Sequence, residues 1–360
     1  MAHCRRCDNL ANMHSALTPQ PVETHLQLLQ RLQHDLDAAL RPLLLNAPSV
    51  ALLDFPDFSN VGDSAIWLGA LNTLARLGVA APCHSCDARR YDRASLARRI
   101  GRGVILLNGG GNFGDLWPRH QLFRERIIAD FPDNPIVMMP QSMHFVDPQA
   151  AARARSAFRS HEQLTILLRD RESFLDATQM FGDITRLVPD TAFGLAPMHR
   201  AHAPDVEILW LKRADQEDRW AAADVAPFGD AFADWAGDED TRLVRLHNAL
   251  VRATRHTATA RTATARTARG VLRWLHPRLA GERLDRGVRL LSRARVVVTD
   301  RLHGHILCLL LGVPHVVLDN SYGKLSRFIA AWSHTSALVK VASSPAEAHE
   351  MARALLNDGA

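Results

Sequence analysis

The sequence predicts an α/β protein with two domains, each built on a parallel sheet, and a ligand site between them. Short apolar segments alternate with helical ones, and the expected strands are apolar throughout, as in sheets covered on both faces. The length of 360 residues suits two domains. The alternation stops at 192–204, which is rich in Ala, Pro and His, and then resumes. We therefore expect a flexible terminus over 1–20 and domains over 21–200 and 201–360.

In the first domain, the pattern predicts an initial helix followed by alternating strands and helices. Leucines recur at helical spacing from Thr24 to Leu45, which indicates the first helix. The apolar runs expected as strands are 50–55, 104–107, 136–139 and 165–168. The helices expected between and after them are 64–77, 119–130, 148–159 and 172–180.

The second domain has the same alternation, broken by an Arg-rich insertion at about 241–281. The expected strands are 206–211, 296–299 and 316–318, and the expected helices are 304–311, 324–332 and 345–356. Within the insertion, His256–Gly270 is a repeat with the sequence HTATARTATARTARG. Its threonines lower helix propensity, so we expect a flexible loop between helices there.

The composition is that of a globular protein. Hydrophobic residues make up 47% and charged residues 22%, which excludes a disordered chain and a collagen-like fibre. The longest nearly apolar stretch, Ile306–Leu318, contains Gly, Pro and His and is too short to span a bilayer. The first residues, MAHCRRCDNL, lack the apolar core of a signal peptide. We therefore expect a cytoplasmic protein.

The basic charge is concentrated in the insertion. Between Thr241 and Gly281 there are nine Arg and no Asp, Glu or Lys, whereas the net charge of the whole chain is +5. Such a segment could contact anionic lipid headgroups, a polyphosphate or nucleic acid. A solvated helix face or a flexible insertion would carry the same charge.

Four of the five cysteines form two CxxC pairs, Cys4 with Cys7 and Cys83 with Cys86. Four thiolates could hold a tetrahedral zinc. The pairs lie 76 residues apart, however, and an expected strand and helix separate them. We expect no metal and no cofactor, and we expect Cys308 to lie in the core.

Polar clusters follow the strands of the first domain, at the sheet edge where ligands bind in open α/β folds. Asn60, Gly62 and Asp63 open a helix, where free N–H groups attract anions. Helix capping alone would also explain Asp63. These residues are expected to bind substrate.

Two further clusters follow later strands of this domain. Gly110, Gly111 and Asn112 belong to a glycine run that lets a ligand approach the backbone, and the run matches neither GxGxxG nor a P-loop. Arg169 and Arg171 follow another strand and could hold a carboxylate or phosphate. A tight turn and surface ion pairs are the corresponding structural alternatives.

The richest cluster lies in the second domain, between an apolar strand and an apolar helix. It contains Asp300, Arg301, His303 and His305. Histidine titrates near neutral pH and is the usual general acid or base, and here a cation and a carboxylate stand beside it. We therefore expect a catalytic group at this strand end.

Three smaller groups complete the set of candidates. Ser321, Tyr322 and Lys324 follow the next strand, and Lys324 could reach a phosphate at a helix start. Lys212 follows the strand at 206–211 and is a weaker candidate of the same kind. Asp190 supplies a carboxylate after a short apolar run.

Taken in order, these motifs resemble the polysaccharide pyruvyl transferase family. The segments that carry the resemblance run from about Asn60 to Trp332: SNVGDSAIW, NGGGNFGDLW, MMPQSMHF, LLRDRESF, VPDTAF, LWLKRADQE and VVVTDRLHGHILCLLLGVPHVVLDNSYGKLSRF. The resemblance implies two Rossmann-like domains that face a central cleft, similar to the GT-B architecture. It also implies transfer of a pyruvyl group from phosphoenolpyruvate to a sugar of a bacterial exopolysaccharide or surface glycan, often as a ketal.

By the same resemblance, His303 and Arg301 are the expected catalytic pair and Arg169 the expected donor anchor. Phosphoenolpyruvate carries a carboxylate and a phosphate, so several cations are needed. His303 is expected to transfer one proton, and Asp63, Asp190 or Asp300 could assist, a choice that the sequence leaves open. The acceptor is expected to be a lipid-linked or polymeric sugar, with possible contact between the Arg-rich insertion and the inner face of the plasma membrane.

Two other functions fit parts of the sequence. A glycosyltransferase that uses a nucleotide sugar would have the same two-domain architecture. A non-catalytic protein could bind nucleic acid through the Arg-rich insertion, but Trp274 is the one aromatic residue there, which is a poor platform for stacked bases. We therefore expect no nucleic-acid partner.

Overall fold

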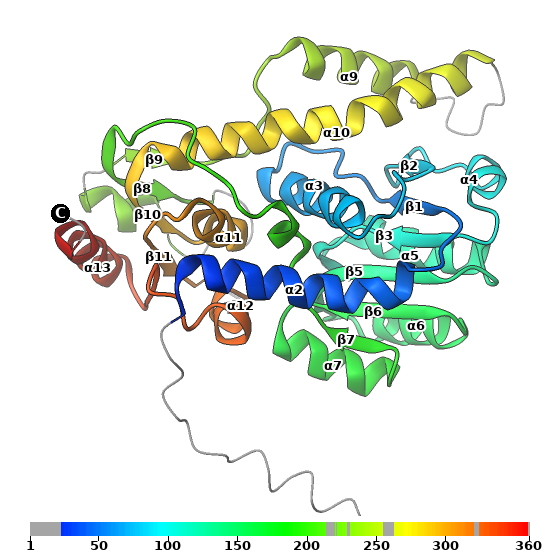
Figure 1. Cartoon of the computed structure of the whole chain (residues 1–360), viewed down its shortest axis with the longest axis horizontal. Helices are drawn as coiled ribbons and strands as arrows, with labels where there is room; N and C mark the ends of the chain where they lie inside the picture. The colour runs from blue at the N-terminus through cyan, green and yellow to red at the C-terminus, as the bar shows by residue number, and fades with distance from the viewer. Residues whose placement is uncertain are drawn as a thin grey trace, which may run out of the picture.

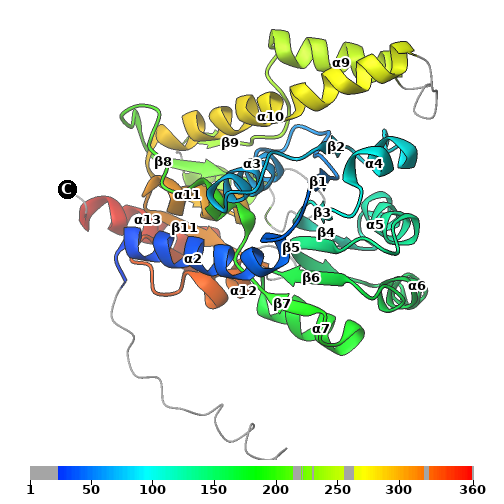
Figure 2. The ribbon, with the colours of Figure 1, turned by 45° about the vertical axis from the view of Figure 1, so that its right-hand side comes forward.

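The computed structural model describes residues 23–213, 220, 222–228, 231–254, 263–319 and 324–358. In this part of the chain, helices surround two parallel sheets (Figures 1 and 2). The expected flexible terminus, Cys4, Cys7, Ser321 and Tyr322 lie outside the described residues. No helix among those described is both long and apolar enough to cross a bilayer.

Within the described residues, the first sheet has seven strands, in the order β2-β1-β3-β5-β6-β7 with β4 also paired to β5. Every pairing is parallel. The strands are β1 (Val50–Leu53), β2 (His84–Cys86), β3 (Val104–Leu107), β4 (Gly110–Gly114), β5 (Ile136–His144), β6 (Leu164–Leu168) and β7 (Thr185–Leu187). Their carboxyl ends therefore meet at one edge.

Helices cover both faces of the first sheet. One face packs against α4 (Arg93–Ile100), α5 (Pro118–Asp130), α6 (Pro148–Arg159) and α7 (Arg171–Phe181). The other packs against α2 (His25–Leu44), α3 (Val61–Arg76) and part of α10 (Ala263–Ser292). Side-chain caps fix several of these helix starts, including Thr24 before α2 and Asn60 before α3.

The second sheet has five strands in the described part of the chain, in the order β12-β11-β10-β8-β9, again parallel. They are β8 (Val206–Leu211), β9 (Ala231–Ala233), β10 (Ala294–Thr299), β11 (His315–Leu318) and β12 (Val339–Ala342). Helices α11 (Leu302–Leu311) and α12 (Lys324–Trp332) pack on one face, and α8 (Ala222–Val225) and α13 (Pro345–Asp358) on the other. This architecture confirms the expected α/β class with two Rossmann-like sheets in a GT-B-like arrangement.

Helices α2 and α10 each pack against both sheets. In α2, Leu28 and Leu32 lie in the core beside the second sheet, whereas Leu36 and Leu40 lie in the core beside the first. In α10, Leu279 packs near the first sheet and Leu291 near the second. Figure 1 shows α10 running across the top of the molecule, paired with α9 (Arg242–Thr254).

The structure corrects one expectation from the sequence, the flexible loop at the threonine repeat, and adds detail at two other segments. The glycine run does not form only a turn, because Gly110–Gly114 continues beside a lengthened β5. The threonine repeat is helical from Ala263 onward, where it begins α10. The segment at 192–204, where the alternation of strands and helices stops, starts within a buried 3-10 helix, η2 (Thr191–Leu195). This helix packs so closely on α3 that a Cβ at Gly69 would lie 2.0 Å from the Thr191 carbonyl oxygen.

Candidate active site

A cavity of about 430 Å³ lies where the carboxyl ends of the first sheet meet the start of α11. The described residues that line it come from both halves of the chain: Phe58, Asn60, Asp63, Gly111, Asn112, Trp117, Arg119, His120, Arg169, Arg213, Trp235, Arg301, Leu302, His303 and Leu325. Four of these carry guanidinium groups and only one carries a carboxyl group. The lining is therefore strongly cationic, as a site for a multiply charged anion requires.

Asp190 joins the two halves of the cavity. Its Oδ2 accepts a hydrogen bond from Arg169 Nη1 at 2.6 Å and lies 3.6 Å from His303 Nε2. Its Oδ1 accepts from the backbone N–H of Ala192 at 2.8 Å, because Asp190 caps η2. One fully buried carboxylate thus sets the positions of an arginine and a histidine that come from different sheets.

The charges in this group act strongly on its carboxyls. Burial alone would raise the pKa of Asp190, but His303 and Arg169 together outweigh burial and lower that pKa. Burial raises the pKa of Asp63, because the opposing effects of His303 and Arg169 are smaller there. Asp190 is therefore an ionised partner for cations, whereas Asp63 holds a proton more readily than an ordinary aspartate.

Gly62 and Arg169 show how tightly the site is built. A Cβ at Gly62 would lie 2.5 Å from Cγ of His303, so only glycine leaves room for the imidazole. Arg169 donates from Nε to Ser142 Oγ at 3.0 Å, and its carbonyl accepts from Trp332 Nε1 at 2.7 Å. The imidazole of His303 and the guanidinium of Arg169 are therefore held in place before any ligand binds.

On the second sheet, Arg301 is held by Asp234, with Nη2 2.8 Å from Oδ2. Next to it, Asp300 is buried and accepts a hydrogen bond from the backbone N–H of Arg213 at 2.9 Å. Burial raises the pKa of Asp300 to about 6. Asp300 is not among the cavity residues, so its visible effect is to fix the backbone at Arg213, which is one of them.

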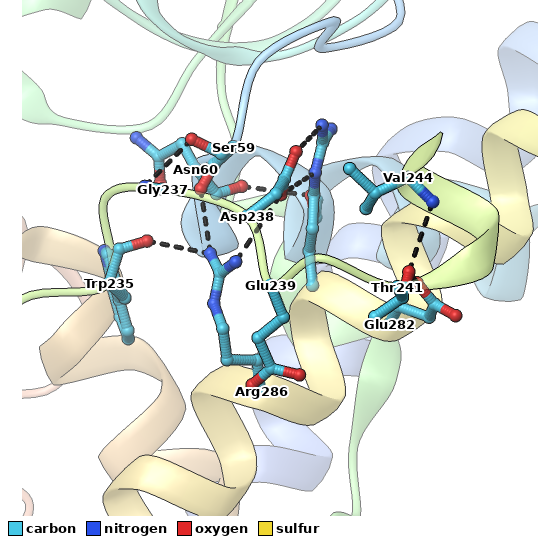
Figure 3. A network of polar contacts seen from close by, with 12 residues as sticks. Ser59, Asn60, Trp235, Gly237, Asp238, Glu239, Thr241, Val244, Glu282 and Arg286 are labelled. Atoms are coloured by element: carbon cyan, nitrogen blue, oxygen red, sulfur yellow. Dashed lines mark hydrogen bonds and ion pairs between the residues drawn. The ribbon is translucent and has the colours of Figure 1, made fainter. Parts of the chain in front are cut away.

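Trp235 enters the cavity from the loop after β9, and α10 holds that loop in place. Arg286 donates from Nη2 to the carbonyls of Trp235 at 2.8 Å and Ser59 at 2.9 Å (Figure 3). Gly237 N also donates to Ser59 Oγ at 2.9 Å. The helix thereby ties a loop of the second sheet to the loop before α3, which carries Phe58 and Asn60.

The structure adds a second histidine that sequence reasoning missed. His120 lines the cavity, and its Nδ1 lies 2.9 Å from both carboxylate oxygens of Asp54. Asp54 directly follows β1 and has φ of 65°, a left-handed conformation that non-glycine residues seldom adopt. Arg119 Nη2 lies 3.2 Å from the other ring nitrogen of His120. The available signal was the segment WPRH, which directly follows the glycine motif.

The glycine motif contributes Gly111 and Asn112 to the lining. Arg124, fully buried, donates to the backbone carbonyl and side-chain oxygen of Asn112. Gly110 adopts φ of 130°, and a Cβ there would lie 3.3 Å from Asp63 Oδ1. The run therefore brings the chain close to Asp63, although Gly110 itself is not among the lining residues.

Other residues expected to bind substrate lie away from the cavity. His305 is completely buried between His315, at 2.7 Å, and Ser333, at 2.9 Å. Arg171 is exposed at the start of α7, and Lys212 donates to the Arg213 carbonyl. Lys324 begins α12, and its side chain lies outside the described part of the chain.

Cys83, Cys86 and Cys308 are free thiols, and the described residues contain no group of three His, Cys, Asp or Glu that could hold a metal ion. Burial raises the pKa of Cys86 well above its usual range, which favours a neutral thiol over a metal-binding thiolate. The first CxxC pair lies outside the described residues.

Comparison with known proteins identifies the family. A model of the family described as polysaccharide pyruvyl transferase matches residues 60–322. The chain belongs to this family. Pyruvyl transferase 1 of Schizosaccharomyces pombe is 31% identical over 79% of this chain and 70% of its own length. The putative pyruvyl transferase EpsO of Bacillus subtilis is 29% identical over 78% of this chain and 84% of its own length.

A solved structure supports the fold of this pyruvyl transferase. An uncharacterised protein from Klebsiella pneumoniae matches with a TM-score of 0.53 at 16% identity, over 87% of this chain and 99% of that one. The family match extends from Asn60 into the segment after β11, and so it includes Asp190, Arg169 and His303. The protein is an enzyme that transfers a pyruvyl group to a polysaccharide.

Proposed function

We propose that this pyruvyl transferase takes its pyruvyl group from phosphoenolpyruvate. The acceptor is a sugar of a bacterial exopolysaccharide or cell-surface glycan precursor, and the product is a ketal. The observation that carries the proposal is the contact of one buried carboxylate, Asp190, with both Arg169 and His303. A doubly anionic donor needs fixed cations around it and a proton carrier beside it, and the cavity offers both.

The proposed reaction needs one group that donates a proton and one that accepts a proton, and its steps are as follows. A proton adds to the methylene carbon of phosphoenolpyruvate, which makes the central carbon electrophilic and turns the methylene into a methyl group. A sugar hydroxyl attacks that carbon and loses its proton. The bond from this carbon to the phosphate oxygen then breaks, and inorganic phosphate leaves. A second hydroxyl attacks the same carbon, loses its proton and closes the ketal.

We assign one proton transfer to His303, because it lines the cavity and its Nε2 lies 3.6 Å from the buried carboxylate of Asp190. Asp63 is assigned the other, since burial raises its pKa and it lines the same cavity. Arg169 and Arg301 bind the carboxylate and phosphate of the donor, with Asn60, Gly62, Gly111 and Asn112 shaping the space around it. No step requires a metal, because arginines carry the charge that a metal would otherwise balance.

The test of the histidine is phosphate release from phosphoenolpyruvate in the presence of a glycan acceptor. Replacing His303 with Gln (His303→Gln) should lower kcat by about 10²–10⁴-fold, the usual worth of a general acid or base. The matched control is His202→Gln, at an exposed histidine that does not line the cavity. Wild-type kcat in the His303 variant would overturn the assignment.

The test of the donor anchor compares two arginines two residues apart. Arg169→Lys keeps the positive charge beside Asp190 but loses the fork of N–H groups, so the KM for phosphoenolpyruvate should rise at least about tenfold. Arg171→Lys changes an exposed side chain outside the cavity and should leave KM unchanged. Equal effects of the two variants would contradict the assignment.

We also propose that the enzyme works at the inner face of the plasma membrane, on a lipid-linked acceptor. The hairpin of α9 and α10 supports this, because it exposes Leu246 and Trp274 next to arginines. Arg278 stacks 3.7 Å above the Trp274 ring. Trp274→Ala combined with Leu246→Ala should reduce cosedimentation with phosphatidylglycerol vesicles severalfold. Unchanged cosedimentation would count against membrane contact.

A further inference from the structure

A second, smaller cavity of about 90 Å³ lies between α10 and the segment formed by β2 and α4. Figure 1 shows α10 passing beside this edge of the first sheet. We call the cavity the basic pocket. Its described lining residues are His84, Ser85, Cys86, Asp87, Arg90, Asp92, Ser95, Arg98, Arg99, Arg269, Gly270, Leu272, Arg273 and His276. None of them lines the catalytic cavity.

The basic pocket has more cations than its carboxylates balance. Its lining contains five arginines and two aspartates among the described residues. Asp87 forms an ion pair with Arg90, whose Nη1 lies 2.6 Å from Asp87 Oδ2. Asp92 caps α4 through the backbone N–H of Ser95 and lies 4.0 Å from Arg269. Within the described part of the chain, no carboxylate lies within ion-pair distance of the three remaining arginines, Arg98, Arg99 and Arg273.

Those arginines also act on one another and on a neighbouring histidine. The pKa of Arg273 is lowered by burial and then by the charge of Arg99. Burial, followed by Arg273 and Arg99, lowers the pKa of His84 to about 4. His84 is therefore neutral at pH 7, and its Nδ1 accepts from Arg273 Nη1 at 3.4 Å. The charges of Arg99 and Arg273 therefore repel each other, and an anion between or beside them would relieve that repulsion.

A buried histidine supplies the second independent observation. His276 lines the basic pocket and is 2% exposed, yet neither ring nitrogen has a hydrogen-bond partner among the described residues. Burial, followed by the charge on His247, lowers the pKa of His276 to about 3, so the ring is neutral. A neutral imidazole always carries one N–H donor, and a buried donor without an acceptor is costly.

We propose that the basic pocket binds a phosphate-type oxyanion, with Arg99 and Arg273 as its charge partners and His276 as a hydrogen-bond donor. The cavity is several times larger than one water requires, which leaves room for a phosphate-sized group. Guanidinium forks match phosphate oxygens in geometry as well as charge. The inference concerns binding alone and does not depend on the donor or acceptor proposed above.

The loop before α3 places this site next to the catalytic cavity. Phe55 stacks on His276 with ring centroids 3.9 Å apart, and Asp57 pairs with Arg90 at 2.8 Å. Three residues further on, Phe58 and Asn60 line the catalytic cavity. Residues 55–60 therefore connect the basic pocket with the catalytic cavity.

The test is titration of the purified full-length protein with inorganic pyrophosphate by calorimetry. Arg99→Gln, at an exposed side chain, and Arg273→Met should each weaken binding at least about tenfold while the melting temperature stays within a few degrees. The control is Arg278→Met, on the same helix but outside the pocket. To separate binding in the catalytic cavity, the series is repeated in Arg169→Lys, where pyrophosphate should still bind. Equal affinity in wild type, Arg99→Gln and Arg273→Met would overturn the proposal.

Two further arms distinguish the sources of the phosphate. Cosedimentation with phosphatidylcholine vesicles that contain a polyprenyl diphosphate, and its loss in Arg99→Gln, would identify a lipid headgroup as the ligand. Pyrophosphate binding without such cosedimentation would identify a free or nucleotide-like phosphate. Pyruvyl transfer to a phosphate-free sugar should persist in Arg99→Gln, so failure of the basic pocket and failure of the proposed reaction give different results.

Discussion

Gly62 controls the position of His303, although it has no side chain of its own. A Cβ there would lie 2.5 Å from the His303 Cγ, closer than atoms can approach without a shift. Gly62→Ala should therefore displace the imidazole from Asp190 and lower kcat by about 10²-fold, the scale expected for a misplacement of about 1 Å. Steady-state kinetics with saturating donor measures this effect.

Gly281→Ala is the matched control, because Gly281 lies inside α10 with no atom of another element within 4 Å of an added Cβ. It should leave kcat unchanged and raise the free energy of unfolding by about 0.5–1 kcal/mol, since alanine favours helix over glycine. If Gly62→Ala had full activity, the close packing of Gly62 and His303 would not be needed for catalysis.

Asp300 makes a pH-dependent contribution to stability. In the folded protein the carboxyl group of Asp300 stays protonated up to about pH 6. In an unfolded chain the same group loses its proton near pH 4. The folded state thus binds more protons in that interval, and the free energy of unfolding falls as pH rises through it, by up to about 3 kcal/mol. Carboxyls with lowered pKa, such as Asp190, act in the opposite direction at lower pH.

Asp300→Asn removes the titration but keeps an oxygen for the backbone N–H of Arg213. The stability of this variant relative to the wild type should increase between pH 4 and pH 6.5 and then level off. Urea unfolding at a series of pH values measures the difference, in which the effects of all other carboxyls cancel. A difference that stays constant over this range would contradict the raised pKa.

At the scale of elements, α11 shows what a sequence can and cannot predict about a site. The motif that contains His303 and His305 was correctly placed at a strand end followed by a helix. Residues two apart in a helix point in nearly opposite directions. One histidine therefore enters the cavity and the other enters the core. The periodicity of the sequence cannot show which of the two histidines faces the cavity, because that depends on the position of the neighbouring sheet.

Elements with strong apolar periodicity were predictable, and those defined by their neighbours were not. The helix at 148–159 and the strand at 206–211 match the structure at both ends. By contrast, β9 and the loop that carries Asp234 and Trp235 follow an acidic stretch with no regular pattern. Their structure depends on hydrogen bonds from α10, which lies about 50 residues later in the chain. Such long-range contacts leave no local signal.

The contacts of α10 lead to a prediction about this element. Arg286 donates to the carbonyls of Ser59 and Trp235, which would lose this donor in Arg286→Met (Figure 3). We expect the free energy of unfolding to fall by about 2–4 kcal/mol, the scale of two lost acceptor partners. Arg289 lies three residues further along the same helix and forms a half-exposed ion pair with Glu239. Arg289→Met should therefore lower the free energy of unfolding by less than about 1 kcal/mol. Guanidinium unfolding of both variants tests the contrast, and equal losses would contradict it.

At the scale of the whole molecule, the two sheets do not have independent hydrophobic cores. The first half of α2 contributes Leu28 and Leu32 to the core beside the second sheet, and its second half contributes Leu36 and Leu40 to the core beside the first. In α10 the order is reversed: Leu279 lies in the core beside the first sheet, and Leu291 lies in the core beside the second. Separating the sheets would therefore expose one half of each helix to water, at roughly 25 cal/mol for each Å² of apolar surface.

We therefore expect the chain to unfold in a single transition, although it contains two sheets. Scanning calorimetry should give one peak whose calorimetric and van't Hoff enthalpies agree, and unfolding followed by circular dichroism and tryptophan fluorescence should coincide. Leu32 and Leu36 lie one turn apart in α2 but belong to the cores beside different sheets. Leu32→Ala and Leu36→Ala should each destabilise the whole molecule in a single transition, by about 2–5 kcal/mol for a fully buried leucine. Two resolved peaks, with each variant lowering only one of them, would show that the sheets unfold independently and that α2 does not join their cores.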